Sequence, residues 1–148
     1  ADDDDMDWEE EILGKMENGY ENNRFSSFWE YDTDMTYPMI LAKIPVKHPW
    51  EIFAYLPFGN WNECPDTPEL MAVAKYWFEQ YGAVPAVLTH DVLEFDLSTA
   101  ISKECAMEVA LEQYGFCPDI VDQGPEDATV GSLADGLRQS KVWYFWWD

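Results

Sequence analysis

The net charge of this chain is −22 over 148 residues, and any fold has to reconcile that charge with an apolar composition. Hydrophobic residues make up 47% of the chain and aromatic residues 16%. Acidic chains that remain disordered are poor in aromatic residues and cannot bury enough apolar surface to fold. We therefore expect an aromatic core under a surface of carboxylates, which repels nucleic acid and anionic membranes and attracts cationic partners.

The negative charge is densest near the N-terminus. Residues 1–34 contain 13 acidic residues against Lys15 and Arg24, so this segment carries half of the net charge. The whole chain is short enough for a single domain. We divide it into an acidic N-terminal arm or short helix over 1–36 and an α+β domain over 37–148.

Local patterns predict the elements of the first third of the chain. Asp7 is the expected cap of a short helix over 8–16, because apolar residues recur there at helical spacing. A frayed, solvated arm is the alternative. Apolar and aromatic runs over 39–46 and 50–56 predict two strands.

A helix is expected over 67–81, with Thr67 as its cap, Pro68 at its first position and Gly82 at its end. The later elements follow from the same signals: a hairpin of strands over 84–88 and 92–97, a helix from Ser102 to a stop at Gly115, a loop over 116–125, a helix over 129–139 and an apolar strand over 142–148. This order predicts a single-domain α+β fold, with helices packed on one face of a mostly antiparallel sheet.

One strand has a pattern that predicts which side faces water. Val92, Glu94 and Asp96 alternate with apolar residues, which is typical of a half-buried strand with its carboxylates in solvent.

Cysteine and histidine are the residues with the clearest chemical potential. Cys64 precedes a predicted helix, whose N-terminus could lower a thiol pKa, and His90 could serve as a base beside it or beside Cys117. The simpler reading is that the thiols are buried and that each Cys-Pro-Asp sequence forms a turn. Since the spacing fits no known metal motif, we expect neither a metal nor a cofactor.

Acidic, amide and tryptophan side chains of the two Cys-Pro-Asp regions and the C-terminus are the candidates for partner contact. They are Trp61, Asn62, Glu63, Asp66, Asp119, Asp122, Gln123 and Trp147. The four carboxylates among them could also form a cluster for acid–base chemistry or for a hard cation.

Two stretches near the C-terminus carry a resemblance to a known family. These are 116–124, Phe-Cys-Pro-Asp-Ile-Val-Asp-Gln-Gly, and 140–148, Ser-Lys-Val-Trp-Tyr-Phe-Trp-Trp-Asp. Together with 57–65 and 81–85, they resemble the bacterial domain of unknown function 4253 over about residues 38–148. The resemblance implies accessory proteins of toxin–immunity neighbourhoods and implies no catalytic residues.

We therefore expect an acidic binding protein of the immunity or inhibitor type, which neutralises a basic protein partner such as a bacterial toxin, for example a nuclease. The alternatives are a small enzyme with a Cys/His/acid pocket, a DNA-mimic protein, and a surface that is acidic for solubility alone. Only 8 Lys and Arg residues are present, so direct nucleic-acid binding is not expected. Apolar runs are too short to span a bilayer and the acidic start is unlike a signal peptide, so we expect a cytoplasmic protein. The patterns predict no oligomeric state.

Overall fold

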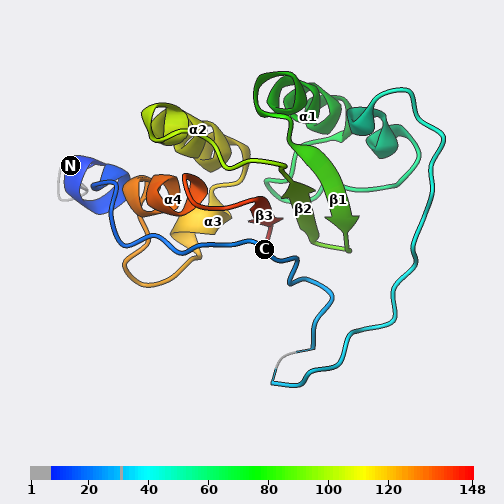
Figure 1. Ribbon diagram of the computed structural model, residues 1–148, viewed down its shortest axis with the longest axis horizontal. Coiled ribbons are helices and arrows are strands. Elements are labelled where there is room, and N and C mark those ends of the chain that lie inside the picture. The colour runs from blue at the N-terminus through cyan, green and yellow to red at the C-terminus, as the bar shows by residue number, and fades with distance from the viewer. Residues whose placement is uncertain (1–7, 31) are drawn as a thin grey trace.

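The computed structural model describes residues 8–30 and 32–148, and its centre is a three-stranded antiparallel sheet in the order β1-β2-β3. The strands are β1 (Val84–Leu88), β2 (Val92–Asp96) and β3 (Val142–Trp146). The helices are η1 (Trp8–Leu13), η2 (Pro49–Ala54), α1 (Thr67–Tyr81), α2 (Lys103–Phe116), α3 (Asp119–Asp122) and α4 (Val130–Leu137). Helices α1 and α2 lie side by side above the sheet (Figure 1). The predicted single-domain α+β fold is confirmed.

The core is a cluster of aromatic rings around Trp77 of α1, which is 1% exposed. Its indole lies 5.1–5.6 Å, centroid to centroid, from the rings of Phe95, Phe116, Trp143 and Phe145. These rings come from β2, α2 and β3, so one side chain joins both helices to the sheet. Aromatic pairs at such distances stabilise a fold beyond the area that they bury.

The predicted helices and hairpin are confirmed, with differences at their ends. Asp66, one residue before Thr67, caps α1, because its side chain accepts a hydrogen bond from the amide of Glu69 at 3.1 Å. Gly82 ends α1 with a φ of +73°. Gly115 does not end α2, since the helix continues to Phe116, whose ring packs into the core. The expected loop after it contains the short helix α3.

The two strands predicted before α1 are wrong. Residues 39–46 are extended but pair with no strand of the described chain, and residues 32–43 are exposed. The second run forms η2, because Pro49 opens a helical turn and the Glu51 carboxylate accepts the amides of Lys47 and His48. Of its aromatic residues, Phe53 is buried at 3% exposed, whereas Tyr55 is 62% exposed.

The N-terminal arm lies against the domain. Residues 14–27 run past α4 and the end of β3, where the carbonyl of Asn22 accepts the amides of Lys141 and Val142 at 3.2 and 3.0 Å. The Gly19 amide donates to the carboxylate of Asp135 at 2.8 Å. A methyl group at Gly131 would overlap the carbonyl of Lys15, so the two backbones are in close contact. The predicted helix at 8–16 is shorter than expected, and its predicted cap, Asp7, lies outside the described residues.

This arm explains why the alternation predicted for β2 fails. Glu94 is 0% exposed although it points away from the aromatic core. Its two carboxylate oxygens accept the amides of Ser26 and Ser27 at 3.2 and 3.3 Å, and the Ser27 hydroxyl at 2.6 Å. A buried carboxylate is tolerated where several donors satisfy it. The arm therefore covers part of the second face of the sheet.

The strand β3 is at the edge of the sheet rather than in its centre, yet Val142, Trp143 and Phe145 are buried.

No helix within the described residues is long and apolar enough to cross a membrane.

We predict that Ser27→Ala loosens the arm. The substitution removes the short hydroxyl donor to Glu94, so the free energy of unfolding should fall by about 1–3 kcal/mol in a urea titration. Ser98→Ala, in an exposed loop, is the matched control and should stay within about 0.5 kcal/mol of the native chain. Equal stability of the two variants would show that the arm is not held through Glu94.

Candidate functional site

The structure brings four of the predicted partner-contact residues together beside the C-terminus. The rings of Trp61 and Trp147 meet edge to face at 6.3 Å. The Asn62 amide group donates to the backbone carbonyl of Asp148, whose own amide donates to the Asp119 carboxylate at 2.8 Å. Trp147 is 1% exposed, so it is a core side chain that supports Trp61 rather than a surface contact.

The other four predicted residues do not join this group as a single cluster. Asp66 caps α1, and Asp122 accepts the hydroxyl of Tyr114 at 2.9 Å. Glu63 and Gln123 are exposed on separate segments. Among the described residues, no group of three or more His, Cys, Asp or Glu side chains is arranged to hold a metal ion.

The thiols that could have formed a reactive pocket are sealed in the core. Cys64 is 5% exposed and Cys117 is 0% exposed. Burial raises the pKa of each thiol to about 12, so both remain protonated at neutral pH. The thiol of Cys117 donates to the carbonyl of Trp146. The His90 side chain is 90% exposed in the β1–β2 turn, where it contacts Asp91 at 3.4 Å. The structure therefore does not pair Cys64 or Cys117 with the His90 imidazole, as the enzyme hypothesis requires.

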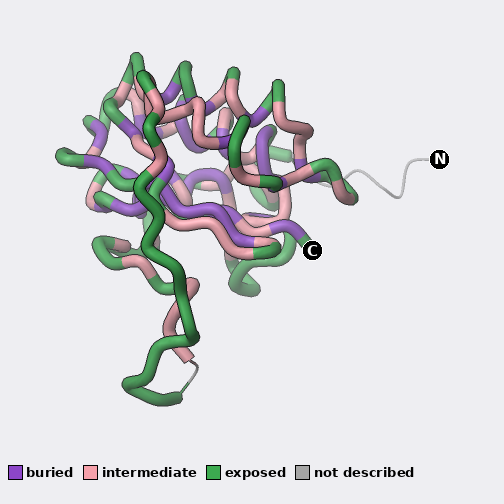
Figure 2. Tube along the Cα trace, turned by 90° about the vertical axis from the view of Figure 1, so that its right-hand side faces the viewer, coloured by how far each residue is buried: buried purple, intermediate pink, exposed green. Residues whose placement is uncertain are grey.

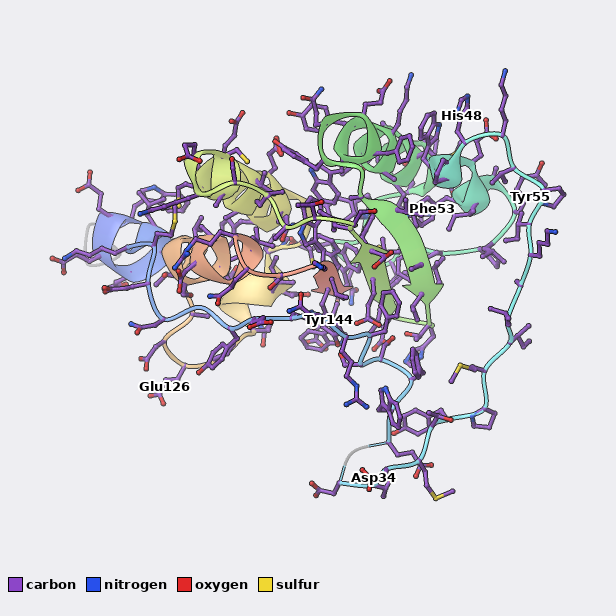
Figure 3. All side chains as sticks on the ribbon, in the orientation of Figure 1. Asp34, His48, Phe53, Tyr55, Glu126 and Tyr144 are labelled. Carbon is purple, nitrogen blue, oxygen red and sulfur yellow. The ribbon has the colours of Figure 1, made fainter. Side chains whose placement is uncertain are left out.

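A larger site, which the sequence did not indicate, lies between the arm and the domain. A cavity of about 870 Å³ is bounded by arm residues from Glu9 to Asn22, by the loop before α4, by α4 and by β3. We call it the arm cleft. Figure 3 labels two of its lining residues, Glu126 on the loop that precedes α4 and Tyr144 on β3.

The charge of the arm cleft is strongly negative. The carboxylates among its lining residues belong to Glu9, Glu10, Glu17, Glu126 and Asp127. Lys15 is the one Lys or Arg side chain that the described structure contributes to this lining. A cleft with carboxylates of one sign concentrates cations at its mouth.

Two residues that line the arm cleft carry buried hydrogen-bond donors that lack acceptors. Gln113 of α2 and Trp143 of β3 both line the cleft, and each is 1% exposed. Within the described structure, the Gln113 Nε2 and the Trp143 Nε1 have no hydrogen-bond partner. A buried polar group without a partner costs about 1–3 kcal/mol of stability. Groups that are kept at such a cost are candidates for binding a ligand group that accepts hydrogen bonds.

The wall of the cleft is held in place electrostatically. The Gly19 amide, followed by the neighbouring Arg138, lowers the pKa of Asp135, so this carboxylate stays ionised under mildly acidic conditions. Arg138 contacts the Asp135 carboxylate at 2.7 Å. The arm is therefore joined to α4 by a hydrogen bond to an ionised carboxylate.

One sequence signal could have identified the cleft. Gln113 follows Ala106, Val109 and Ala110 on the buried face of α2, where an amide side chain breaks the apolar pattern. A polar residue on a buried helical face needs a partner, and that need is visible before the structure is known.

We predict that the three thiols react at very different rates. Cys105, on α2, is the only one of the three that is not fully buried, so iodoacetamide should label it first in the folded protein. Cys64 and Cys117 should be labelled only after unfolding, because burial and a raised pKa both suppress the thiolate. Mass spectrometry of the labelled peptides gives the rates. Fast labelling of Cys64 or Cys117 in the folded state would show that the thiol is accessible and would support the enzyme hypothesis.

We predict opposite stability effects for two glutamine substitutions. Gln113→Met removes a buried amide that lacks a partner, so the free energy of unfolding should rise by about 1 kcal/mol. Gln139→Met is the matched control, because the Gln139 amide donates to the Asp135 carbonyl at 3.0 Å. This control should lose about 1 kcal/mol in the same denaturant titration. Destabilisation by Gln113→Met would mean that the amide is satisfied in the protein itself.

Comparisons with curated proteins and with solved structures gave no match. A family model matches residues 40–148. This range includes the four residues that meet beside the C-terminus, the buried thiols and the domain side of the arm cleft, whereas the arm lies outside it. The chain therefore belongs to the family described as Domain of unknown function (DUF4253).

Proposed function

We propose that this chain is an acidic binding protein of the immunity or inhibitor type, which neutralises a basic protein partner such as a bacterial toxin, for example a nuclease. The observation that carries the proposal is the large excess of acidic over basic side chains. Of the ion pairs that join two described residues, Arg138–Asp135 is the one between an Arg or Lys and a carboxylate. The chain holds 30 Asp and Glu residues against 8 Lys and Arg.

Two of the basic side chains are placed on aromatic rings. The guanidinium of Arg24 lies 4.3 Å from the ring centroid of Trp29, and the ammonium of Lys75 lies 5.9 Å from that of Trp50. Cations held in this way stabilise aromatic surfaces. The excess carboxylates are therefore left to interact with cations outside the chain.

The arm cleft offers such a partner a specific place to bind. Its carboxylates would attract a lysine or arginine of the partner, and long-range attraction would raise the association rate. A peptide group next to that side chain would bring a carbonyl oxygen, which the Gln113 and Trp143 donors would bind once neighbouring side chains move to expose them. The rigid aromatic core holds these groups in place before binding, which lowers the entropic cost of association.

The alternatives fit the geometry less well. An enzyme that used Cys64 or Cys117 would need a thiolate, and burial of both thiols opposes one. A DNA mimic would need carboxylates at regular spacing along one elongated face, whereas the carboxylates of the arm cleft border a concave site.

The proposal predicts a salt-dependent complex. Immobilised protein should retain a basic protein from a lysate of the source cell at low salt and release it at high salt, since salt screens exposed charges. Mass spectrometry should identify that protein, and titration of the purified pair should give a dissociation constant. Retention of no basic protein at low salt would refute the proposal.

Matched variants then locate the contact. The double substitution Glu126→Gln, Asp127→Asn neutralises the cleft rim, and Gln113→Met removes the inner donor. Each should weaken binding about tenfold or more, the loss expected for one charge-assisted hydrogen bond. The control Glu104→Gln, Glu108→Gln makes the same charge change on α2 outside the cleft and should have a smaller effect. Equal losses in the two doubly substituted variants, with no loss for Gln113→Met, would mean that the partner senses only net charge.

A further inference from the structure

A run of exposed apolar residues lies between the arm and η2 in the described part of the chain. Met39, Ile40 and Leu41 are 56%, 92% and 100% exposed, and Tyr37 is 49% exposed. Figure 2 shows this segment in green, extending away from the body of the domain. A contiguous exposed apolar patch on a folded protein usually marks an interaction site.

This stretch also differs from the rest of the chain in its charge. We call residues 37–47 the linker segment. It contains Lys43 and Lys47 and no acidic residue, although the chain as a whole carries −22. Its backbone is extended and its residues belong to no strand, although its composition predicts one. It is therefore an apolar, basic and unpaired peptide attached to a strongly acidic domain.

A surface with the complementary properties lies on the helical side of the molecule. A groove of about 580 Å³ runs between α1 and α2, and its apolar lining includes Val73, Tyr76 and Phe116. Tyr76 is 41% exposed, so the groove is open to solvent. Glu69 and Glu112 lie in its walls and make it acidic.

The linker segment does not reach the groove of its own chain. In Figure 1 the linker segment climbs the right-hand side of the molecule to η2, which lies on the side of α1 away from α2, and Figure 2 shows it in green at the outside of the domain. The segment and the groove of one chain therefore lie on different sides of α1, and a second molecule can bring the two kinds of surface together.

We propose that the linker segment of one copy of this chain docks in the α1–α2 groove of a second copy, and that the exchange is reciprocal. The apolar side chains around Leu41 would fill the groove, and Lys43 or Lys47 would meet Glu69 or Glu112. Because each copy carries both surfaces, a twofold dimer uses both and closes without further growth. The proposal does not rest on the binding of a basic partner, because it concerns neither the arm cleft nor its carboxylates.

Salt separates the two proposals. Two chains of −22 each repel one another, so screening should strengthen self-association through an apolar contact. The complex with a basic partner should weaken under the same change. If one of the two proposals fails, the salt dependence of the other complex can therefore still be measured.

Sedimentation velocity over a range of protein concentrations, at low and at high salt, tests the dimer. The full chain should dimerise, and more strongly at high salt. Leu41→Glu places a charge in the linker segment, and Ala72→Glu places one in the groove. Each substitution should raise the dissociation constant of the dimer about tenfold or more. Both positions are exposed, so circular dichroism and thermal unfolding should remain native. The control Tyr55→Glu adds the same charge at a residue that is 62% exposed and belongs to neither surface, and it should still dimerise.

Mixing the two variants gives the decisive readout. The Ala72→Glu chain keeps an intact linker segment and the Leu41→Glu chain keeps an intact groove. A mixture should therefore regain association that neither variant shows alone. A native chain that stays monomeric at high salt, a dimer that both substitutions leave unchanged, or a mixture that stays monomeric would each overturn the proposal.

Discussion

The contact on which the remaining structure depends is the packing of the Trp77 indole against rings from β2, α2 and β3. A chain with this excess of negative charge gains little from attraction between its own charged groups, so burial of aromatic surface has to supply its stability. Because that burial is concentrated around one side chain, the stability of the core does not depend on the surface residues. The carboxylates can then be numerous and uncompensated without weakening the core, and an acidic exterior becomes compatible with a small domain.

The second organising feature is the arm, which belongs to this chain but lies outside the family match at residues 40–148. It covers Glu94, a carboxylate that would otherwise face water from the middle of the sheet. It also provides one wall of the arm cleft, whose other walls come from α4 and β3. The family domain and the arm therefore build the cleft together, and its acidity comes from both.

The sequence predicted the elements whose signals are local and failed where long-range contacts decide. Helix α1 and the β1–β2 hairpin follow from capping residues, periodicity and a turn, which act over a few neighbours. The strand predicted at 39–46 has the right composition, but a strand also needs a neighbour, and the described chain supplies none. Glu94 was expected in water because its serine partners are 67 and 68 residues away. For the candidate site, the sequence indicated Trp61, Asn62 and Asp119, whereas the cleft depends on how the arm folds back.

The way in which the arm is held has a consequence for the integrity of the molecule. Its anchors at Gly19, Asn22 and Ser27 are all non-covalent contacts with the domain, and its covalent connection runs through the exposed residues 32–43. Exposed, extended chain is the preferred substrate of proteases. A single nick there would leave two polypeptides that migrate separately on a denaturing gel but remain one particle in native buffer. The arm cleft would survive such processing, because none of its walls includes the severed connection.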